Sequence, residues 1–187
     1  MKIGFIGSHS SGKTTLVWQL AAWLKLQGYQ DVAIVSEIAR ECDLVKNKDT
    51  TFDSQFWILM NQIDRERRLR DHEILLTDRT VIDNLAYSAW ALLKTEKITR
   101  WEYTFMEKVA RAWSMLYPYK IVFFLEPLKL QKDSQRDLDP KYQRFIYRKI
   151  KDLSTLFEPN VVYFKGTKED RFEDMKEEML RLLKDKV

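Results

Sequence analysis

The sequence predicts an α/β protein, a single three-layer α/β/α domain in which helices cover both faces of a five-stranded parallel sheet. Three observations support this fold class. Short apolar runs alternate with longer segments of helical periodicity. The runs are apolar throughout, which is typical of parallel strands buried on both faces. No repeat, low-complexity tract or linker divides the 187 residues, so residues 1–187 are expected to form one domain around one core.

The first strand and helix are the clearest of these elements. Residues 2–6 form an apolar, β-branched-rich run that stops at Gly7, as a buried strand would. Apolar side chains recur at helical spacing through residues 13–26, and Gly28 stands where a C-terminal glycine is expected. Further strands are expected at 31–35, 74–77, 121–125 and 161–164, and further helices at 52–70, 81–93, 101–117, 141–157 and 169–184.

Composition and charge narrow the class of protein. The 32 basic and 28 acidic residues give a net charge of only +4, and the basic residues are dispersed, which argues against a nucleic-acid-binding module. The one basic cluster, residues 65–70, is interleaved with acids (among them Glu66) and is interpreted as a solvated helix face. A lone Cys42 excludes an internal disulfide and a cysteine-rich zinc site, and favours a reducing compartment.

The sequence gives no indication of a membrane partner. No apolar run approaches the roughly 20 residues that a membrane-spanning helix needs. The first strand begins at once, with no charged leader before it. We therefore expect a cytoplasmic protein.

Residues 7–14 carry the most specific motif. They read Gly-Ser-His-Ser-Ser-Gly-Lys-Thr and match the phosphate-binding pattern G-x-x-x-x-G-K-[ST] at every fixed position, between a strand and a helix. In such a P-loop, backbone N–H groups and the helix N-terminus face the phosphates. Lys13 would supply a cation to the β- and γ-phosphates, and the Thr14 hydroxyl would hold Mg²⁺. The cofactors expected are Mg²⁺ and ATP, with GTP left open as the donor, bound by Gly7, Ser8, His9, Ser10, Ser11, Gly12, Lys13, Thr14 and Thr15.

Charged residues follow the second and third strands, where an open parallel sheet binds its ligands. Glu37 could accept a proton from a hydroxyl that attacks the γ-phosphate, or it could cap a helix or pair with Arg40. Asp78 ends an apolar strand as a Walker B aspartate does and is expected to hold Mg²⁺. Arg79 could hold a substrate phosphate or hydroxyl, or pair with Asp78 or Asp83.

Residues 128–139, after the fourth strand, are charged and aperiodic. A segment of this kind between a strand and a helix is interpreted as a lid over the site. Arg136 could move from it onto the transferring phosphate and offset developing charge. The alternative is a solvated loop.

Together these motifs resemble the small P-loop kinases related to thymidylate kinase, and in particular the branch that contains ribosylnicotinamide kinase domains and small AAA-type ATPase proteins. The resemblance rests on residues 36–41 (Ser-Glu-Ile-Ala-Arg-Glu), on Thr-Asp-Arg at 77–79 with Leu-Ala-Tyr at 85–87, and on the charged segment. It implies the P-loop NTPase fold of the nucleotide kinase type. It also implies that Glu37 contacts the phosphate-accepting hydroxyl, Asp78 the metal or substrate, and that Arg136 is a lid arginine.

Two functions are compatible with these residues. The first is a kinase that moves the γ-phosphate of ATP to a nucleoside, nucleotide or related small metabolite, with Lys13, Glu37, Asp78 and Arg136 as catalytic residues and Glu37, Arg40 and Arg79 at the substrate. The second is a P-loop ATPase that acts as a nucleotide-dependent switch on a protein partner. A GTPase is disfavoured, because no Asn-Lys-x-Asp string follows the fourth strand. Aromatic residues of the helix at 101–117 predict either core packing or a homodimer face.

Overall fold

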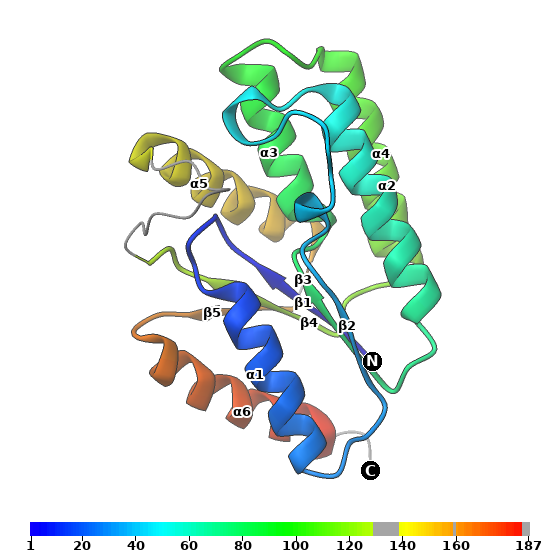
Figure 1. The fold of residues 1–187 in the computed structure, drawn as a ribbon, viewed down its shortest axis with the longest axis vertical. Helices are drawn as coiled ribbons and strands as arrows, with labels where there is room; N and C mark the ends of the chain where they lie inside the picture. Colours follow the sequence, from blue (N-terminus) through cyan, green and yellow to red (C-terminus); the bar gives the residue numbers. More distant parts are fainter. Residues whose placement is uncertain (129–138, 159, 185–187) are drawn as a thin grey trace.

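The fold is a five-stranded parallel sheet with helices on both faces (Figure 1). A computed structural model of the chain describes residues 1–128, 139–158 and 160–184. The strand order is β2-β3-β1-β4-β5, so the first strand lies at the centre. This architecture confirms the predicted fold class. The strands are β1 (Lys2–Ile6), β2 (Val32–Val35), β3 (Ile74–Asp78), β4 (Ile121–Leu125) and β5 (Val161–Phe164).

Six α-helices occupy the described residues, and each lies close to its expected range. They are α1 (Lys13–Leu26), α2 (Phe52–Leu69), α3 (Val81–Leu93), α4 (Arg100–Leu116), α5 (Pro140–Phe157) and α6 (Lys168–Lys184). Thr51, Thr80 and Thr99 begin α2, α3 and α4 with capping boxes, which satisfy backbone N–H groups of the first turn. Two short 3-10 turns, η1 (Ile38–Arg40) and η2 (Asn47–Asp49), lie between β2 and α2.

The sheet separates two apolar layers. Helices α1 and α6 cover one face, while α2 to α5 cover the other (Figure 1). Along β1, Ile3 and Phe5 pack toward α1 and α6, whereas Ile6 packs toward the opposite helices. All three side chains are fully buried. The central strand is therefore buried from solvent on both faces, as its continuous apolar run predicts.

The register of β1 and β3 determines which residues lie next to each other at the carboxyl edge of the sheet. Phe5 of β1 lies opposite Asp78 of β3, and the backbone N–H of Arg79 donates to the carbonyl of Phe5 at 3.1 Å. The end of β3 and the chain that leaves β1 at Gly7 therefore lie side by side.

A buried polar cluster lies at the amino edge of the sheet, and it shows that the prediction of a solvated helix face at residues 65–70 was wrong for Glu66. Glu66 of α2 is fully buried rather than solvated, although the arginines around it in the sequence are exposed. Its carboxylate accepts hydrogen bonds from Lys2 Nζ at 2.8 Å, Trp113 Nε1 at 2.7 Å and the Tyr119 hydroxyl at 2.6 Å. Alternating charge in the sequence could not reveal this, because the three donors come from β1, from α4 and from the chain between α4 and β4.

The aromatic residues of α4 divide between core and surface. Trp113 is buried, whereas Trp101 is 74% exposed. None of the helices in the described ranges has the length and apolarity to cross a membrane.

Candidate active site

Residues 7–12 form a tight turn between β1 and α1 that depends on two glycines. Gly7 has φ +145° and Gly12 has φ +84°, which are conformations that L side chains rarely adopt. A Cβ atom at Gly7 would lie 2.6 Å from the carbonyl oxygen of Leu125. Gly12 is the N-cap of α1, so the positive end of that helix dipole lies at the loop.

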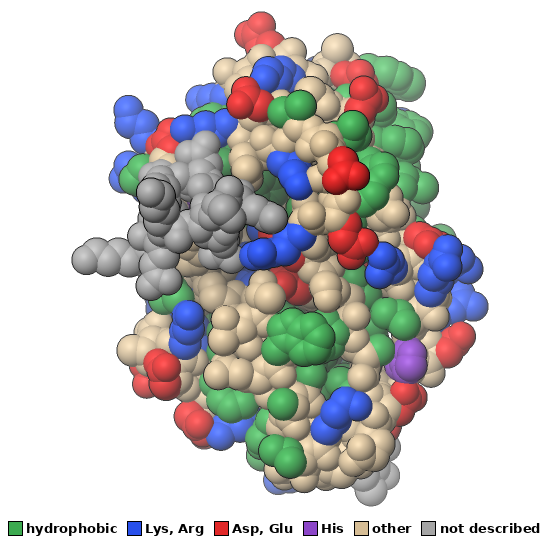
Figure 2. All heavy atoms as spheres, in the orientation of Figure 1, with side chains coloured by type: hydrophobic (Ala, Val, Ile, Leu, Met, Phe, Trp, Pro, Cys, Tyr) green, Lys and Arg blue, Asp and Glu red, His purple; other side chains and the backbone are tan. Residues whose placement is uncertain are grey.

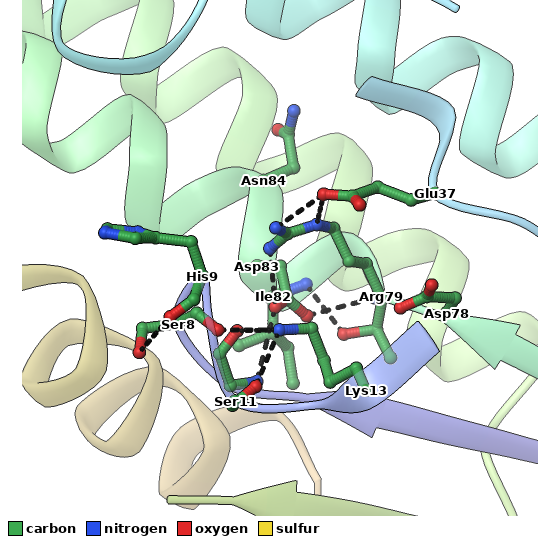
Figure 3. A network of polar contacts seen from close by, with 12 residues as sticks. Ser8, His9, Ser11, Lys13, Glu37, Asp78, Arg79, Ile82, Asp83 and Asn84 are labelled. Carbon is green, nitrogen blue, oxygen red and sulfur yellow. Dashed lines mark hydrogen bonds and ion pairs between the residues drawn. The ribbon is translucent and has the colours of Figure 1, made fainter. Parts of the chain in front are cut away.

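Lys13 lies at the centre of this loop (Figure 3). Its Nζ donates to the carbonyl oxygens of Gly7 at 2.6 Å and Ser8 at 2.8 Å, and to Ser11 Oγ at 3.0 Å. Burial, reinforced by the charge of Arg79, lowers the pKa of Lys13 to about 8, against the opposing effect of nearby carboxylates. The loop therefore places a buried cation where the motif expects phosphates.

Side chains from α5 and α6 hold the outside of the loop. Arg171 of α6 is 2% exposed and donates to the carbonyl oxygens of Ser11 at 3.1 Å, Glu126 at 2.8 Å and Gly166 at 3.0 Å. Gln143 of α5 donates to the carbonyl oxygen of His9 at 3.0 Å. Both residues are absent from the sequence prediction, since neither lies near a motif in the chain.

Thr14 and Asp78, the two residues predicted to hold the metal, contact each other. The Thr14 hydroxyl donates to Asp78 Oδ2 at 2.6 Å. Asp78 Oδ1 is buried and has no hydrogen-bond partner among the described residues. Burial, together with the charge of Glu37, raises the pKa of Asp78, while Lys13 and the Thr14 hydrogen bond oppose the rise. A buried carboxylate oxygen without a partner, next to a hydroxyl, fits an oxygen-binding cation such as Mg²⁺.

Glu37 is held between two arginines. Arg79 donates to Glu37 Oε1 through Nε at 2.8 Å and lies 2.7 Å from it through Nη2, as Figure 3 shows, while Arg40 Nε donates to Oε2 at 2.9 Å. Burial favours a higher pKa for Glu37, but Arg79 and then Lys13 outweigh it and hold the pKa well below its usual range. Glu37 is therefore an ionised carboxylate at neutral pH.

Arg79 also contacts Asp83, and in this way connects Glu37 to the P-loop. Its Nη1 lies 3.3 Å from Asp83 Oδ1, an oxygen that also accepts from the backbone N–H of Gly7 at 3.4 Å. Its guanidinium lies 5.1 Å from the ring centre of Tyr87. The alternative in which Arg79 pairs with Asp83 is thus observed, and the pairing with Glu37 is added to it.

A pocket opens beside Glu37 and the P-loop. Its cavity volume is about 80 Å³, and it opens to solvent. In Figure 2 acidic and basic side chains meet at a hollow near the centre of the face. Polar side chains of α2 and α3 line the pocket together with the arginines, and apolar side chains of η1 and α2 complete it; examples are Gln55, Asn84, Ile38 and Ile58. The pocket has the mixed polar and apolar lining of a small-molecule site.

The structure brings most of the predicted site residues together. Lys13, Thr14, Glu37, Asp78 and Arg79 form one connected cluster, and Arg40 is attached to it through Glu37. His9 lines the pocket and stacks on Tyr142 with ring centres 5.3 Å apart, and Thr15 lies exposed on the first turn of α1. Arg136 and most of the predicted lid at 128–139 lie outside the described residues.

A family model described as an AAA domain matches residues 2–171. The chain belongs to this AAA-domain family. No curated protein matches the sequence.

Solved structures of deoxyadenosine kinase and of the NadR protein share the fold. Deoxyadenosine kinase from M. mycoides with bound dATP has a TM-score of 0.71 at 15% identity, over 96% of this chain and 98% of that one. The same enzyme with dCMP and dCDP gives 0.69 at 17% identity, over 97% of this chain and 100% of that one. The NadR protein in complex with NR gives 0.70 at 17% identity, over 89% of this chain but 46% of NadR. The predicted resemblance to P-loop kinases is therefore confirmed at the level of the fold.

Proposed function

We propose that this protein is a kinase that transfers the γ-phosphate of ATP, with Mg²⁺, to a hydroxyl group of a nucleoside-like small molecule. The observation that carries the proposal is the position of Glu37, an ionised carboxylate in the wall of a pocket that adjoins the P-loop. An ATPase that uses only water needs no such second pocket.

Residues of the P-loop account for the donor half of the reaction. The loop amides and Lys13 would hold the β- and γ-phosphates. Thr14 and Asp78 would hold Mg²⁺, which neutralises charge on the phosphate oxygens when bound. Asp83 accepts from the Gly7 N–H, and in this way supports the turn itself.

Glu37 accounts for the acceptor half. Its Oε1 is held by Arg79, which is 13% exposed, whereas its Oε2 is held by Arg40, which is 42% exposed. An acceptor hydroxyl can therefore replace Arg40 at Oε2 while Arg79 keeps the carboxylate oriented. The hydroxyl oxygen forms the new bond to the γ-phosphorus as the bond to the β-phosphate oxygen breaks and ADP leaves. The hydroxyl proton passes to Glu37 and then to solvent.

A lowered pKa suits this role in phosphoryl transfer. The transition state is loose in most analyses, so the attacking hydroxyl needs orientation more than early deprotonation. A carboxylate that stays ionised can accept the hydrogen bond of the hydroxyl at every pH near neutrality.

Pocket chemistry favours a nucleoside-like acceptor. Two buried amide side chains, Gln55 and Asn84, belong to the lining, and Asn84 Nδ2 donates to Gln55 Oε1 at 2.9 Å. Asn84 Oδ1 is buried and has no hydrogen-bond partner among the described residues, so it can accept a hydrogen bond from a heterocyclic ring. Deoxyadenosine kinase and NadR, which share the fold, are described with nucleotides or NR bound, and this supports the same class.

The decisive experiment offers the protein Mg-ATP with a panel of nucleosides, nucleoside monophosphates and nicotinamide riboside. A phosphorylated product is expected with at least one nucleoside. Formation of ADP at the same rate with and without every acceptor would instead favour the ATPase that acts as a switch on a protein partner.

Glu37→Gln tests the residue on which the proposal depends. Arg79 would keep the amide oxygen, so the NH₂ group would face the acceptor hydroxyl and could neither accept its hydrogen bond nor take its proton; kcat is expected to fall at least about 100-fold. The Kd for Mg-ATP, measured by calorimetry, should not rise, because Glu37 makes no hydrogen bond to the loop and its loss removes a negative charge near Lys13. The matched control is Glu41→Gln, which removes an exposed carboxylate that pairs with Arg65. Full turnover in Glu37→Gln would remove Glu37 from this role.

A further inference from the structure

Arg79 adopts a backbone conformation that is unfavourable for its residue type. Its φ is +87°, in the left-handed region where a bulky side chain is strained. Such a conformation persists only where neighbouring groups hold the backbone on both sides. The N–H of Arg79 donates to the carbonyl of Phe5 at 3.1 Å, so β1 holds one side.

Gln62 of α2 holds the other side. Its Nε2 donates to the carbonyl oxygen of Arg79 at 3.2 Å and to Glu66 Oε1 at 2.8 Å. Gln62 is 3% exposed, and Glu66 lies one helical turn further along α2 and is fully buried. Because the Arg79 carbonyl oxygen can only accept hydrogen bonds, the amide must turn its NH₂ group toward it. The same orientation directs the second N–H at Glu66.

Glu66 is itself fixed from three other directions. Lys2, Trp113 and Tyr119 all donate to its carboxylate within 2.8 Å. One N–H of Gln62 Nε2 thus bonds to the buried cluster around Glu66, and the other bonds to the carbonyl oxygen of the strained residue Arg79. Loss of the amide would leave the Arg79 carbonyl without this donor, and the backbone could relax toward an ordinary conformation.

We propose that Gln62 is a positioning residue that holds the Arg79 backbone in its left-handed conformation and thereby aims the Arg79 guanidinium at Glu37. The proposal deepens the proposed function, on which its kinetic test rests. Gln62 acts through Arg79, which in turn orients the carboxylate that receives the acceptor hydroxyl. Because Gln62 also lines the pocket, backbone hydrogen exchange separates this action from direct contact between Gln62 and an acceptor. The hydrogen bonds of Lys13 to the P-loop do not involve Arg79 and stay in place when Arg79 is displaced.

The test is Gln62→Met, which preserves side-chain length and removes both donors. The acceptor KM is expected to rise and kcat to fall, each about tenfold, with the Kd for Mg-ATP unchanged. Hydrogen exchange of the backbone segment 79–82 should become at least about tenfold faster, since its anchor is gone. The matched control is Asn61→Met, which removes the neighbouring amide of α2, whose donor bonds only the Trp57 carbonyl within the helix. It should change none of these quantities.

Two further variants separate positioning from stability. Trp113→Phe removes one donor from Glu66 but leaves the Gln62 contact with Arg79, so it should lower the melting temperature without changing the acceptor KM. If the Gln62→Met variant does not fold, the Gln62→Asn variant is used in the same measurements. The shorter amide keeps a polar group at the site but cannot span both acceptors, and it should give the same changes in smaller size.

The outcomes distinguish this inference from the proposed function. Wild-type acceptor KM, kcat and exchange in Gln62→Met would overturn the positioning role even if the protein is a kinase. If no acceptor is found, the exchange measurement decides alone. Faster exchange at 79–82 in Gln62→Met but not in Asn61→Met supports the role, and equal exchange in both overturns it.

Discussion

Lys13 keeps its charge in a buried position because three oxygen acceptors of the P-loop replace the water that it loses. The replacement is incomplete, and the pKa falls from 10.5 to about 8. Bound phosphates would restore the preference for the charged form, since they place negative charge beside the ammonium group.

The first residue-scale prediction concerns the pH dependence of ATP binding. Above pH 8 the free protein must take up a proton at Lys13 in order to bind, so the Kd for Mg-ATP should rise about tenfold for each pH unit. Below pH 8 this group contributes no slope. Calorimetry from pH 6.5 to 9.5 at fixed ionic strength measures the effect, and Lys13→Met should abolish the slope. A constant Kd across this range would show that Lys13 keeps its charge.

The lowered pKa of Lys13 affects the stability of the fold in the opposite direction: rising pH weakens ATP binding but favours the folded state. Between pH 8 and 10.5 the unfolded chain holds more protons on Lys13 than the folded chain does. The contribution of this residue therefore makes the fold more stable as pH rises through that window.

Residues with a local pattern were predictable from sequence, and residues without one were not. Lys13, Asp78 and Glu37 each follow a recognisable strand end, and the parallel sheet brings such ends together. Gln62 and Arg171 bond to backbone oxygens far away in the sequence, and the only signal that either gives is its place on a helix. Burial of a polar side chain depends on the tertiary fold, so periodicity could not reveal it.

At the scale of elements, Arg171 connects α6 to the P-loop through a hydrogen bond. Arg171 reaches three carbonyl oxygens, which belong to the P-loop, the end of β4 and the turn after β5. These three segments meet with no other described donor common to them all. The rigid guanidinium can serve them together because its N–H groups point in fixed, divergent directions.

Arg171→Lys is predicted to lower the free energy of unfolding by about 2–4 kcal/mol. The ammonium group cannot reach all three oxygens, and unpaired buried carbonyls are costly. Urea unfolding monitored by tryptophan fluorescence measures the loss. Arg181→Lys provides the control, because Arg181 lies on the same helix and its side chain is 72% exposed. Equal stability of the two variants would contradict the role given to Arg171.

Element boundaries followed from turn and capping chemistry. The predicted helices agree with the observed ones to within one or two residues, because Thr51, Thr80 and Thr99 cap where the helical pattern begins. The prediction of a solvated helix face was wrong at Glu66, because burial there depends on distant residues and not on local sequence. Its α2 neighbours in the sequence are exposed, but the helix turns this one residue toward the sheet, where a long lysine and two aromatic donors meet it.

On the scale of the whole molecule, titratable groups lie at both edges of the sheet. The carboxyl edge holds the candidate site, while Lys2, Glu66 and Glu158 lie toward the amino edge. Burial raises the pKa of Glu158 to about 7, helped by the charge of Glu66 and opposed by the Ser114 hydroxyl and Lys2. No described residue offers a hydrogen bond to Glu158 Oε1.

Glu158→Gln is predicted to stabilise the protein at pH 8 by about 2 kcal/mol, after allowance for solvent screening. The folded chain binds more protons at Glu158 than the unfolded chain between pH 4.5 and 7. Wild-type stability from this group is therefore full below pH 4.5 and is lost as pH rises through 7. The gain in Glu158→Gln should vanish near pH 4.5. Chemical unfolding at several pH values measures this gain in the free energy of unfolding, and Glu169→Gln, at an exposed position, is the control. A gain that does not depend on pH would show that the raised pKa of Glu158 is not its cause.

The left-handed backbone of Arg79 has an energetic cost that its ion pairs offset. Glycine or asparagine would adopt that conformation more easily than arginine. Neither residue could pair with Glu37 and the buried Asp83 as the guanidinium does, and loss of a partner from a buried ion pair costs more than one strained φ angle. Laboratory evolution that rewards only survival at high temperature is therefore expected to retain arginine at position 79.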